Sequence, residues 1–339
     1  MTFFRNFGVA SVAALCLSTT SAQALDLRFN NWLPPTHHLM TRVLLPYFEQ
    51  IEEVTEGRVT VELTNSSLGG MERQYELAET GVADITLHSP SITPGQFPLD
   101  GIVEMPGISE NPEAVSVAYW RTYEEYFAAT DPYHGVHLLS LATLPAYHIY
   151  NAKRPVASID DLDGLQLRAA GIISSEKVEA LGATVIPAQI TQFLELISKG
   201  VIDGAYYSDD GVYAFGFLDS LKYKTEFDGG LGGLATILVM NESKWEQISP
   251  EDQAAITEIS GEAFAKTYGA SMRQSVAEAQ AAMEEAGIET TIADEAFMAE
   301  VRERLAPLEA EWIESANEAG VDGAAALEMI RSEAASYAD

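Results

Sequence analysis

The chain has 339 residues, and its 51 acidic residues against 19 basic ones give a formal net charge of -32 at pH 7. Nucleic acids and anionic membranes are recognised through clustered lysines and arginines, so this composition argues against both as partners. A chain of this length folds into about two domains and buries a core large enough to be stable without cross-links.

Residues 1–24 have the pattern of a secretory signal, with Arg5, an apolar run over 7–17 and a Ser-Ala-Gln-Ala end. The pattern predicts export to the periplasm with cleavage after Ala24. The apolar run is shorter than the roughly 20 residues that span a bilayer, so we expect no direct membrane insertion. The only cysteine, Cys16, lies in this segment, so the mature chain would have no disulfide.

Strands alternate with helices through most of the chain, which indicates an α/β fold. The expected elements, in chain order, are a strand at 26–32, a helix at 38–56, a strand at 58–64, a helix at 71–80, a strand at 83–88, a helix at 111–128, strands within 136–150, helices at 174–181 and 190–199, and strands at 201–207 and 234–240. Beyond Pro250 the pattern is helical, and 250–286 is long enough to form one helix that runs from one domain into the other.

Two segments correspond to each other: 76–89 and 195–208 each hold a helix end, a Gly-Val pair, an aspartate and a short strand. The glycine suits the left-handed position that closes a helix. Ligands of open α/β sheets bind beyond the carboxyl ends of strands, so both strand ends are expected to face one cleft. They would bring together His88, Ser89, Tyr206, Tyr207 and Ser208. A chance match of a common helix-glycine-strand unit is the alternative.

The stretch DLDGLQLRAAG, residues 161–171, predicts a short strand that ends on Arg168 beside small residues. A guanidinium binds a carboxylate through two parallel hydrogen bonds and stays charged in a dry cleft. Arg168 is therefore a candidate for gripping an acidic ligand. The alternative is an internal salt bridge, for which Asp163 and Glu176 are available.

Three further features allow more than one interpretation. His37 and His38 either cap a helix and face solvent, which we favour, or contact a ligand. The segment 228–235 matches the dinucleotide pattern Gly-x-Gly-x-x-Ala but precedes a strand, so it is interpreted as a flexible crossover between lobes. Asp209 and Asp210 could hold a cation, although adjacent acids in a loop are more often solvated.

The sequence shows no nucleophile elbow, zinc-protease motif or phosphate-binding loop. We therefore expect neither an enzyme nor a bound cofactor or metal. A periplasmic hydrolase remains an alternative, to be separated by whether a bound molecule leaves unchanged.

Several of these segments resemble the solute receptors of tripartite ATP-independent periplasmic (TRAP) transporters, the DctP family. The resemblance is carried by DDLDGLQLR, by EALGATVIPAQITQFLELISKGVIDG, by LKYK at 221–224 and by Trp-x-x-Ile-Ser-Pro at 245–250. It implies a two-lobed periplasmic binding protein fold with a long helix spanning both lobes and the ligand in the cleft between them. It also implies that Arg168 grips the carboxylate of a small organic acid and that the receptor, as a monomer, delivers this acid to a membrane permease.

The expected lobes are discontinuous in sequence. Lobe I would comprise 25–146 with 235–272 returning to it, and lobe II would comprise 147–234 with 273–339 returning to it and packing across both. Hinges are expected near 146–150 and 234–240.

The chain departs from the family pattern where many members carry an acid, an asparagine or a second arginine against the ligand. Rings stand there instead, so we expect the pocket to contain Trp32, Tyr147, His148, Tyr206 and Tyr207, with His88 and Ser89 from the first lobe. One arginine among rings predicts a monocarboxylate with an aromatic, apolar or soft-cation body. The alternatives are ordinary core packing of these rings, a C4-dicarboxylate ligand, a receptor for an ATP-driven importer, and a periplasmic ligand sensor.

Overall fold

The computed structural model of the protein describes residues 24–93 and 95–337. The predicted secretory signal and its cleavage site lie outside these residues, apart from Ala24 itself. Within the two described ranges, every helix is too short or too polar to cross a membrane.

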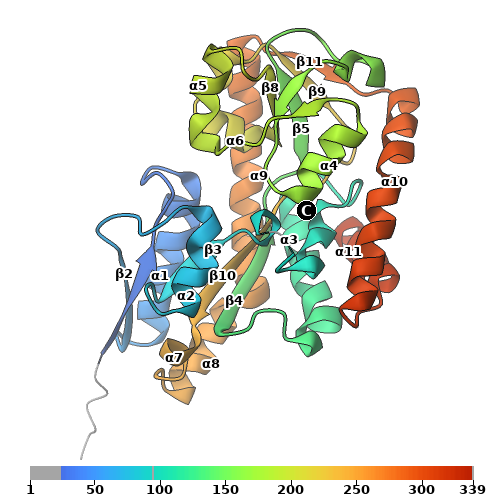
Figure 1. The fold of residues 1–339 in the computed structure, drawn as a ribbon. Helices are drawn as coiled ribbons and strands as arrows, with labels where there is room; N and C mark the ends of the chain where they lie inside the picture. Colours follow the sequence, from blue (N-terminus) through green and yellow to red (C-terminus); the bar gives the residue numbers. More distant parts are fainter. Residues whose placement is uncertain (1–23, 94, 338–339) are drawn as a thin grey trace, which may run out of the picture.

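Two separate β-sheets form the centres of two lobes (Figure 1). In the first lobe the strand order is β2 (Val59–Leu63), β1 (Leu25–Asn30), β3 (Ile85–His88), β10 (Ala235–Asn241) and β4 (Val136–Thr143). In the second lobe it is β11 (Glu289–Ile292), β9 (Tyr223–Glu226), β5 (Tyr147–Asn151), β8 (Gly204–Ser208), β6 (Gln166–Arg168) and β7 (Thr184–Val185). Both sheets mix parallel and antiparallel pairs. The predicted two-lobed α/β fold is confirmed, while the residue boundaries of the lobes remain a prediction.

Helices cover the first-lobe sheet on both faces, as its apolar strands require. One face packs on a π-helical turn at Leu39–Leu44, on α1 (Leu45–Val54), on α8 (Pro250–Ile259) and on the start of α9 (Gly261–Ala286). The other packs on α2 (Gln74–Glu79), a 3-10 helix at Pro98–Glu104, α3 (Pro112–Thr122) and α11 (Gly323–Ser336). The short α7 (Glu242–Trp245) follows β10.

The second-lobe sheet packs on α4 (Ile172–Ala180), α5 (Phe193–Ser198) and α6 (Asp209–Ala214), and on two long helices shared with the first lobe. In α9, Phe264 contributes to the first-lobe core and Met283 to the second. In α10 (Glu295–Glu318), Phe297 belongs to the second-lobe core and Trp312 to the first. Figure 1 shows α9 and α10 running alongside both halves of the molecule.

The predicted single helix over 250–286 is wrong in one respect, because it is interrupted at Ser260. Ser260 has an extended backbone, with φ −94° and ψ −160°, and Gly261 follows at φ +52°. A Cβ at Gly261 would lie 2.7 Å from the Trp120 ring, so only glycine fits there. The Ser260 hydroxyl is 2.6 Å from the hydroxyl of Tyr47, which anchors the break to α1.

The two corresponding segments have the same local structure in both lobes. Gly81 and Gly200 close α2 and α5 with φ of +69° and +68°. Three residues later, Asp84 accepts a hydrogen bond from the backbone N–H of Arg28 at 2.8 Å, and Asp203 does the same for Gln166 at 2.9 Å. Each aspartate therefore ties the strand that follows it to a neighbouring strand, and both strand ends meet at the space between the lobes.

Residues 144–146 and 227–234 connect the two sheets side by side. Leu144 N–H donates to Leu234 O at 2.9 Å, and Tyr147 N–H donates to Gly232 O at 3.0 Å. A Cβ at Gly233 would lie 2.0 Å from the carbonyl oxygen of Leu144, so glycine is required for this close approach. The Gly-x-Gly-x-x-Ala segment is thus a crossover, as predicted, and it is held by backbone hydrogen bonds.

Candidate functional site

A cavity of about 50 Å³ lies between the lobes, and apolar surface dominates its walls. The first lobe contributes Trp32, His88 and Ser89, and the second contributes Tyr207 and Phe215. The carboxyl ends of β3 and β8 therefore meet at this cavity, as the internal correspondence predicted. A concave, largely apolar site with a few polar groups is the usual form of a small-molecule site.

The lobes touch each other beside the cavity. Ser174 of the second lobe donates a hydrogen bond to the buried Glu104 carboxylate of the first at 3.1 Å. Gly171 has φ +84°, and a Cβ there would lie 2.6 Å from the Ser91 carbonyl oxygen across the gap. The glycine at the end of DLDGLQLRAAG thus allows the second lobe to approach the first, and the structure is in a closed form.

Arg168 ends β6 and is buried, with 5% of its surface exposed. Its Nε donates to the Ala188 carbonyl at 3.0 Å, and its Cζ lies 5.4 Å from the centre of the Tyr207 ring. Nη1 is buried without a hydrogen-bond partner, and within the described ranges Arg168 forms no ion pair with any acid. The alternative of an internal salt bridge to Asp163 or Glu176 is therefore wrong for this closed form.

The buried position of the Arg168 guanidinium costs free energy, because the charge is removed from water. Burial lowers the pKa of Arg168 below its usual value, and the nearby Tyr207 and Tyr147 oppose this. An arginine remains protonated at neutral pH, so a buried positive charge is left without a counter-charge. The Tyr147 hydroxyl is also buried without a partner, and burial raises its pKa well above the usual value, which keeps it a neutral donor.

The predicted first-lobe residues line the cavity, but their polar atoms are already bonded. Trp32 Nε1 donates to Leu87 O at 3.0 Å, and Ser89 Oγ donates to Ala235 O at 2.8 Å. Both ring nitrogens of His88 have partners at 3.1 Å, the Met71 carbonyl and the Thr93 hydroxyl. Burial lowers the pKa of His88 to about 4, so the ring is neutral at neutral pH. These residues provide shape and apolar surface.

Four of the predicted residues, Arg168, Tyr147, Tyr206 and His148, do not line the closed cavity. Arg168 and Tyr147 lie next to it, since both contact the lining residue Tyr207. For Tyr206 and His148 the structure differs from the prediction that they lie in the pocket. The Tyr206 hydroxyl donates to Leu231 O at 3.0 Å inside the second lobe, and His148 Nδ1 accepts from Phe227 N–H at 3.4 Å. The Tyr206 and Tyr207 side chains point to opposite faces of β8, and of these two only Tyr207 lines the cavity.

Sequence reasoning did not place three polar residues in the cavity wall: Asp210, Thr236 and Tyr268. The adjacent Asp209 is different, because it accepts from Lys224 Nζ and Gln280 Nε2, each at 2.9 Å, inside the second lobe. The two acids therefore point apart, and residues 24–93 and 95–337 contain no group of three or more metal-ligating side chains. The Asp209–Asp210 pair offered one signal for this site, whereas nothing in the sequence marked Thr236 or Tyr268.

The histidines before the first helix are buried, so the predicted solvent exposure is wrong. His37 Nδ1 accepts from Leu39 N–H at 3.2 Å, which agrees with the predicted capping role, and its ring also lines the cavity. Burial lowers the pKa of His37 to about 4. His38 stacks on His37 with ring centres 4.5 Å apart.

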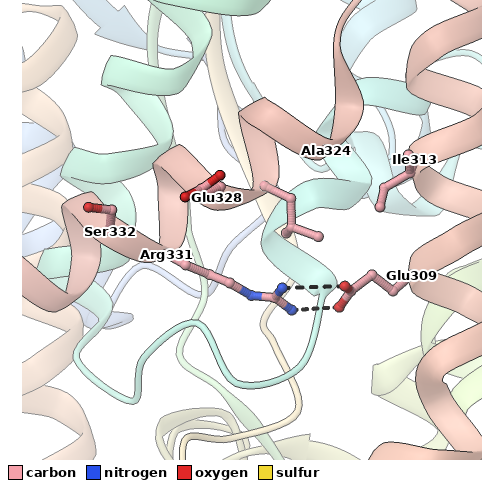
Figure 2. Close-up of a pocket in the computed structure, with 7 residues that line it drawn as sticks. Glu309, Ile313, Ala324, Glu328, Arg331 and Ser332 are labelled. Atoms are coloured by element: carbon pink, nitrogen blue, oxygen red, sulfur yellow. Dashed lines mark hydrogen bonds and ion pairs between the residues drawn. The ribbon is translucent and has the colours of Figure 1, made fainter.

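A larger hollow of about 500 Å³ lies on the outside of the molecule between α10 and α11 (Figure 2). Its only arginine, Arg331, is bonded to Glu309 at 2.6 and 3.3 Å, and Figure 2 shows this paired arrangement. Arg331 also donates to Pro106 O at 3.3 Å. Because its charge is already paired, this groove is a poor candidate for binding an acid.

Two α/β lobes that close on a small cavity define the class of two-lobed solute receptors. The model of the DctP family, bacterial extracellular solute-binding protein family 7, matches residues 29–315. The chain therefore belongs to this family of solute receptors, whose members are not enzymes, and the predicted resemblance is confirmed.

Relatives of known sequence or structure cover nearly the whole chain. The protein called outer membrane transporter protein TsaT, from Comamonas testosteroni, is 32% identical over 99% of both chains. A TRAP periplasmic solute-binding protein from Bordetella bronchiseptica, solved with bound mandelate, is 30% identical with a TM-score of 0.88, covering 92% of this chain and 99% of its own. A marine metagenome TRAP solute-binding protein specific for aromatic acid ligands is 26% identical with a TM-score of 0.85, covering 93% of this chain and all of its own.

Proposed function

We propose that this protein binds an aromatic monocarboxylate as the solute receptor of a TRAP transporter. The observation that carries the proposal is the buried, unpaired Arg168 beside the cavity. Its Nε is bonded to Ala188 O and its Nη1 is buried without a partner in the described residues, so a carboxylate could bind the edge formed by Nη1 and Nη2. Two parallel hydrogen bonds to a carboxylate would satisfy this edge and neutralise the charge.

The carboxylate would reach this edge past Tyr207. The Tyr207 ring both lines the cavity and contacts the guanidinium. In this proposal a turn of the Tyr207 ring would open the cavity to Arg168 and would leave the ring face against the ligand. The unpaired Tyr147 hydroxyl beside them is available as an additional donor.

The cavity walls favour a ring as the body of the ligand. Trp32, Tyr207 and Phe215 present aromatic surface, on which a ligand ring can pack face to edge or offset. No lysine or arginine is among the described residues that line the cavity, and the His37 and His88 rings are neutral at neutral pH. A second carboxylate would have no cationic partner in the cavity wall, which argues against the C4-dicarboxylate alternative.

Two relatives support this ligand class. The Bordetella bronchiseptica protein was solved with mandelate, and the marine metagenome protein is specific for aromatic acids. Both ligands combine one carboxylate with one ring, which is the combination that Arg168 and the cavity walls fit.

In the proposed mechanism the ligand bridges the lobes. Its carboxylate pairs with Arg168 of the second lobe and its ring contacts Trp32 of the first. The ligand favours closure only through its higher affinity for the closed form. The closed receptor, exported by the predicted signal, then delivers the acid to a membrane permease.

The direct test is a thermal-shift panel on the purified mature protein. It would compare mandelate, benzoate, 3-hydroxybenzoate and 3-hydroxyphenylacetate with succinate and glucuronate. A ligand at about a hundred times its Kd adds about 2.7 kcal/mol, a rise of roughly 5 °C in Tm for a chain of this size. We expect such a shift only from aromatic monocarboxylates. A shift with succinate alone, or with none of the acids, would contradict the proposal.

A further inference from the structure

We infer that the cavity has a second polar end, formed by Asp210, Thr236 and Tyr268, that binds a hydroxyl group carried on the ring of the ligand. The inference deepens the proposed function and rests on it, because it takes the carboxylate of the same ligand to be held by Arg168.

The three residues share an unusual property: each is buried, lines the cavity and has an unused polar atom. Asp210 is 3% exposed, Thr236 5% and Tyr268 0%. Asp210 Oδ1, Thr236 Oγ1 and the Tyr268 hydroxyl have no well-aligned hydrogen-bond partner in the part of the chain that the structure describes, although the Thr236 and Tyr268 hydroxyls lie within reach of each other. A buried polar atom without a partner costs free energy, so three of them on one cavity wall indicate a partner that binds there.

Three elements of different lobes bring these atoms to one place. Asp210 begins α6 of the second lobe, whereas Thr236 in β10 and Tyr268 in α9 belong to first-lobe elements. The charge of Asp210 acts on Tyr268, and the Tyr268 hydroxyl lies near Thr236. A group bound by all three would therefore hold the lobes together.

Only one of the two oxygens of the Asp210 carboxylate has a charged or polar neighbour within residues 24–93 and 95–337. Its Oδ2 lies 3.4 Å from Nε2 of His38 in the first lobe, while Oδ1 is free. Arg168 does not pair with Asp210 among the described residues. The two charges affect the pKa of the Tyr207 hydroxyl in opposite directions, since Arg168 lowers it and Asp210 raises it. A Cβ at Gly211 would lie 2.3 Å from Tyr207 Cε1, so this ring packs on the start of α6.

The donors and acceptors at this end match a hydroxyl. Asp210 Oδ1 can only accept, whereas the hydroxyls of Thr236 and Tyr268 can donate. Burial and the charge of Asp210 raise the pKa of Tyr268, so it keeps its proton. A ligand hydroxyl can donate to Asp210 and accept from Tyr268 or Thr236. An ammonium group could satisfy Asp210 but offers no acceptor to the Tyr268 and Thr236 hydroxyls.

The test is calorimetric titration of the full mature protein with benzoate, 3-hydroxybenzoate, 4-hydroxybenzoate and 3-(aminomethyl)benzoate. We expect the better hydroxybenzoate to bind at least tenfold more tightly than benzoate. Asp210→Ala should remove this preference, so that benzoate and the hydroxybenzoates bind this variant with similar affinity. Tyr268→Phe and Thr236→Val should each reduce the preference, and they test the inference independently if Asp210→Ala does not fold.

Tyr47→Phe is the matched control, because it removes a buried hydroxyl in the first lobe that does not line the cavity. It should keep the full preference. The inference is overturned if wild type binds benzoate and the hydroxybenzoates equally, if the preference survives Asp210→Ala, or if 3-(aminomethyl)benzoate binds best. Failure of all four probes to bind wild type would instead overturn the proposed function, and the inference with it.

Discussion

One arginine lies beside the cavity between the lobes and one lines the groove between α10 and α11, but only the first is without an acidic partner among the described residues. The groove is the larger hollow, about 500 Å³ against about 50 Å³. Arg331 in the groove is paired with Glu309, whereas Arg168 beside the cavity is buried without an acid. In this protein an unpaired buried charge therefore indicates the ligand site better than the volume of a hollow does.

The largest expected effect comes from removing the free charge. Arg168→Ala should weaken binding of 3-hydroxybenzoate at least a hundredfold, about 2.7 kcal/mol, because a charge-assisted pair is lost from a desolvated site. Arg331→Ala should leave affinity within about twofold, since this arginine lies outside the cavity. Calorimetric titration measures both, and near-normal binding by Arg168→Ala would remove the assigned role of Arg168.

A second difference is that the cavity wall contains two buried neutral histidines, His37 and His88. The pKa of His88 is lowered from 6.5 to about 4, so between these values the unfolded chain binds more protons than the folded one. His88 therefore leaves the free energy of unfolding undiminished above pH 6.5. As the pH falls below this value the free energy of unfolding decreases, by about 2 kcal/mol at pH 5. Urea unfolding at pH 7 and pH 5 should show this loss, and His88→Asn should reduce it.

His134→Asn is the control for that experiment, because the His134 side chain is 77% exposed. It should leave the pH dependence as in wild type. An unchanged pH dependence in His88→Asn would show that His88 does not have the lowered pKa.

The next effect concerns closure of the lobes over the cavity. Gly171→Ala should weaken binding about tenfold, because the new Cβ would lie 2.6 Å from Ser91 O in the closed form. Gly164→Ala is a matched control, since Gly164 has a similar φ of +73° but nothing within 4 Å of the added Cβ. Both variants carry the backbone strain, and only the first obstructs closure. Equal affinities in the two variants would contradict the steric role of Gly171.

The smallest effect is expected in the groove. Arg331→Ala should lower the free energy of unfolding by about 0.5 kcal/mol, because its partner Glu309 is also partly exposed and such pairs contribute little. Urea unfolding would measure this change, and Glu309→Ala should give a similar value. A loss of several kcal/mol would mean that Arg331 has a structural role beyond this pair.

The fold and Arg168 could be predicted from the sequence because their signals are local. Helix and strand periodicity, the closing glycines at 81 and 200, and the family motifs are all read along the chain. The break at Ser260 could not be predicted, because it depends on Gly261 fitting against the ring of Trp120, which is distant in sequence.

Which polar groups face the cavity also depends on contacts between distant segments. Tyr206 and Tyr207 have the same side chain and point to opposite faces of β8, yet only Tyr207 of the two lines the cavity. Asp209 and Asp210 are likewise adjacent, yet Lys224 and Gln280 satisfy the first and leave the second with a free oxygen. The sequence indicates such candidates, but only the folded chain separates them.

The measurement that tests the central claim most directly is a double-mutant cycle across the proposed pair. It removes the Arg168 guanidinium by Arg168→Ala and the ligand charge by replacing 3-hydroxybenzoate with 3-hydroxybenzamide, with all four Kd values measured by calorimetry. If Arg168 binds the carboxylate, the two changes should be coupled by about 2 kcal/mol or more. A coupling energy near zero would contradict the claim that Arg168 holds the acid.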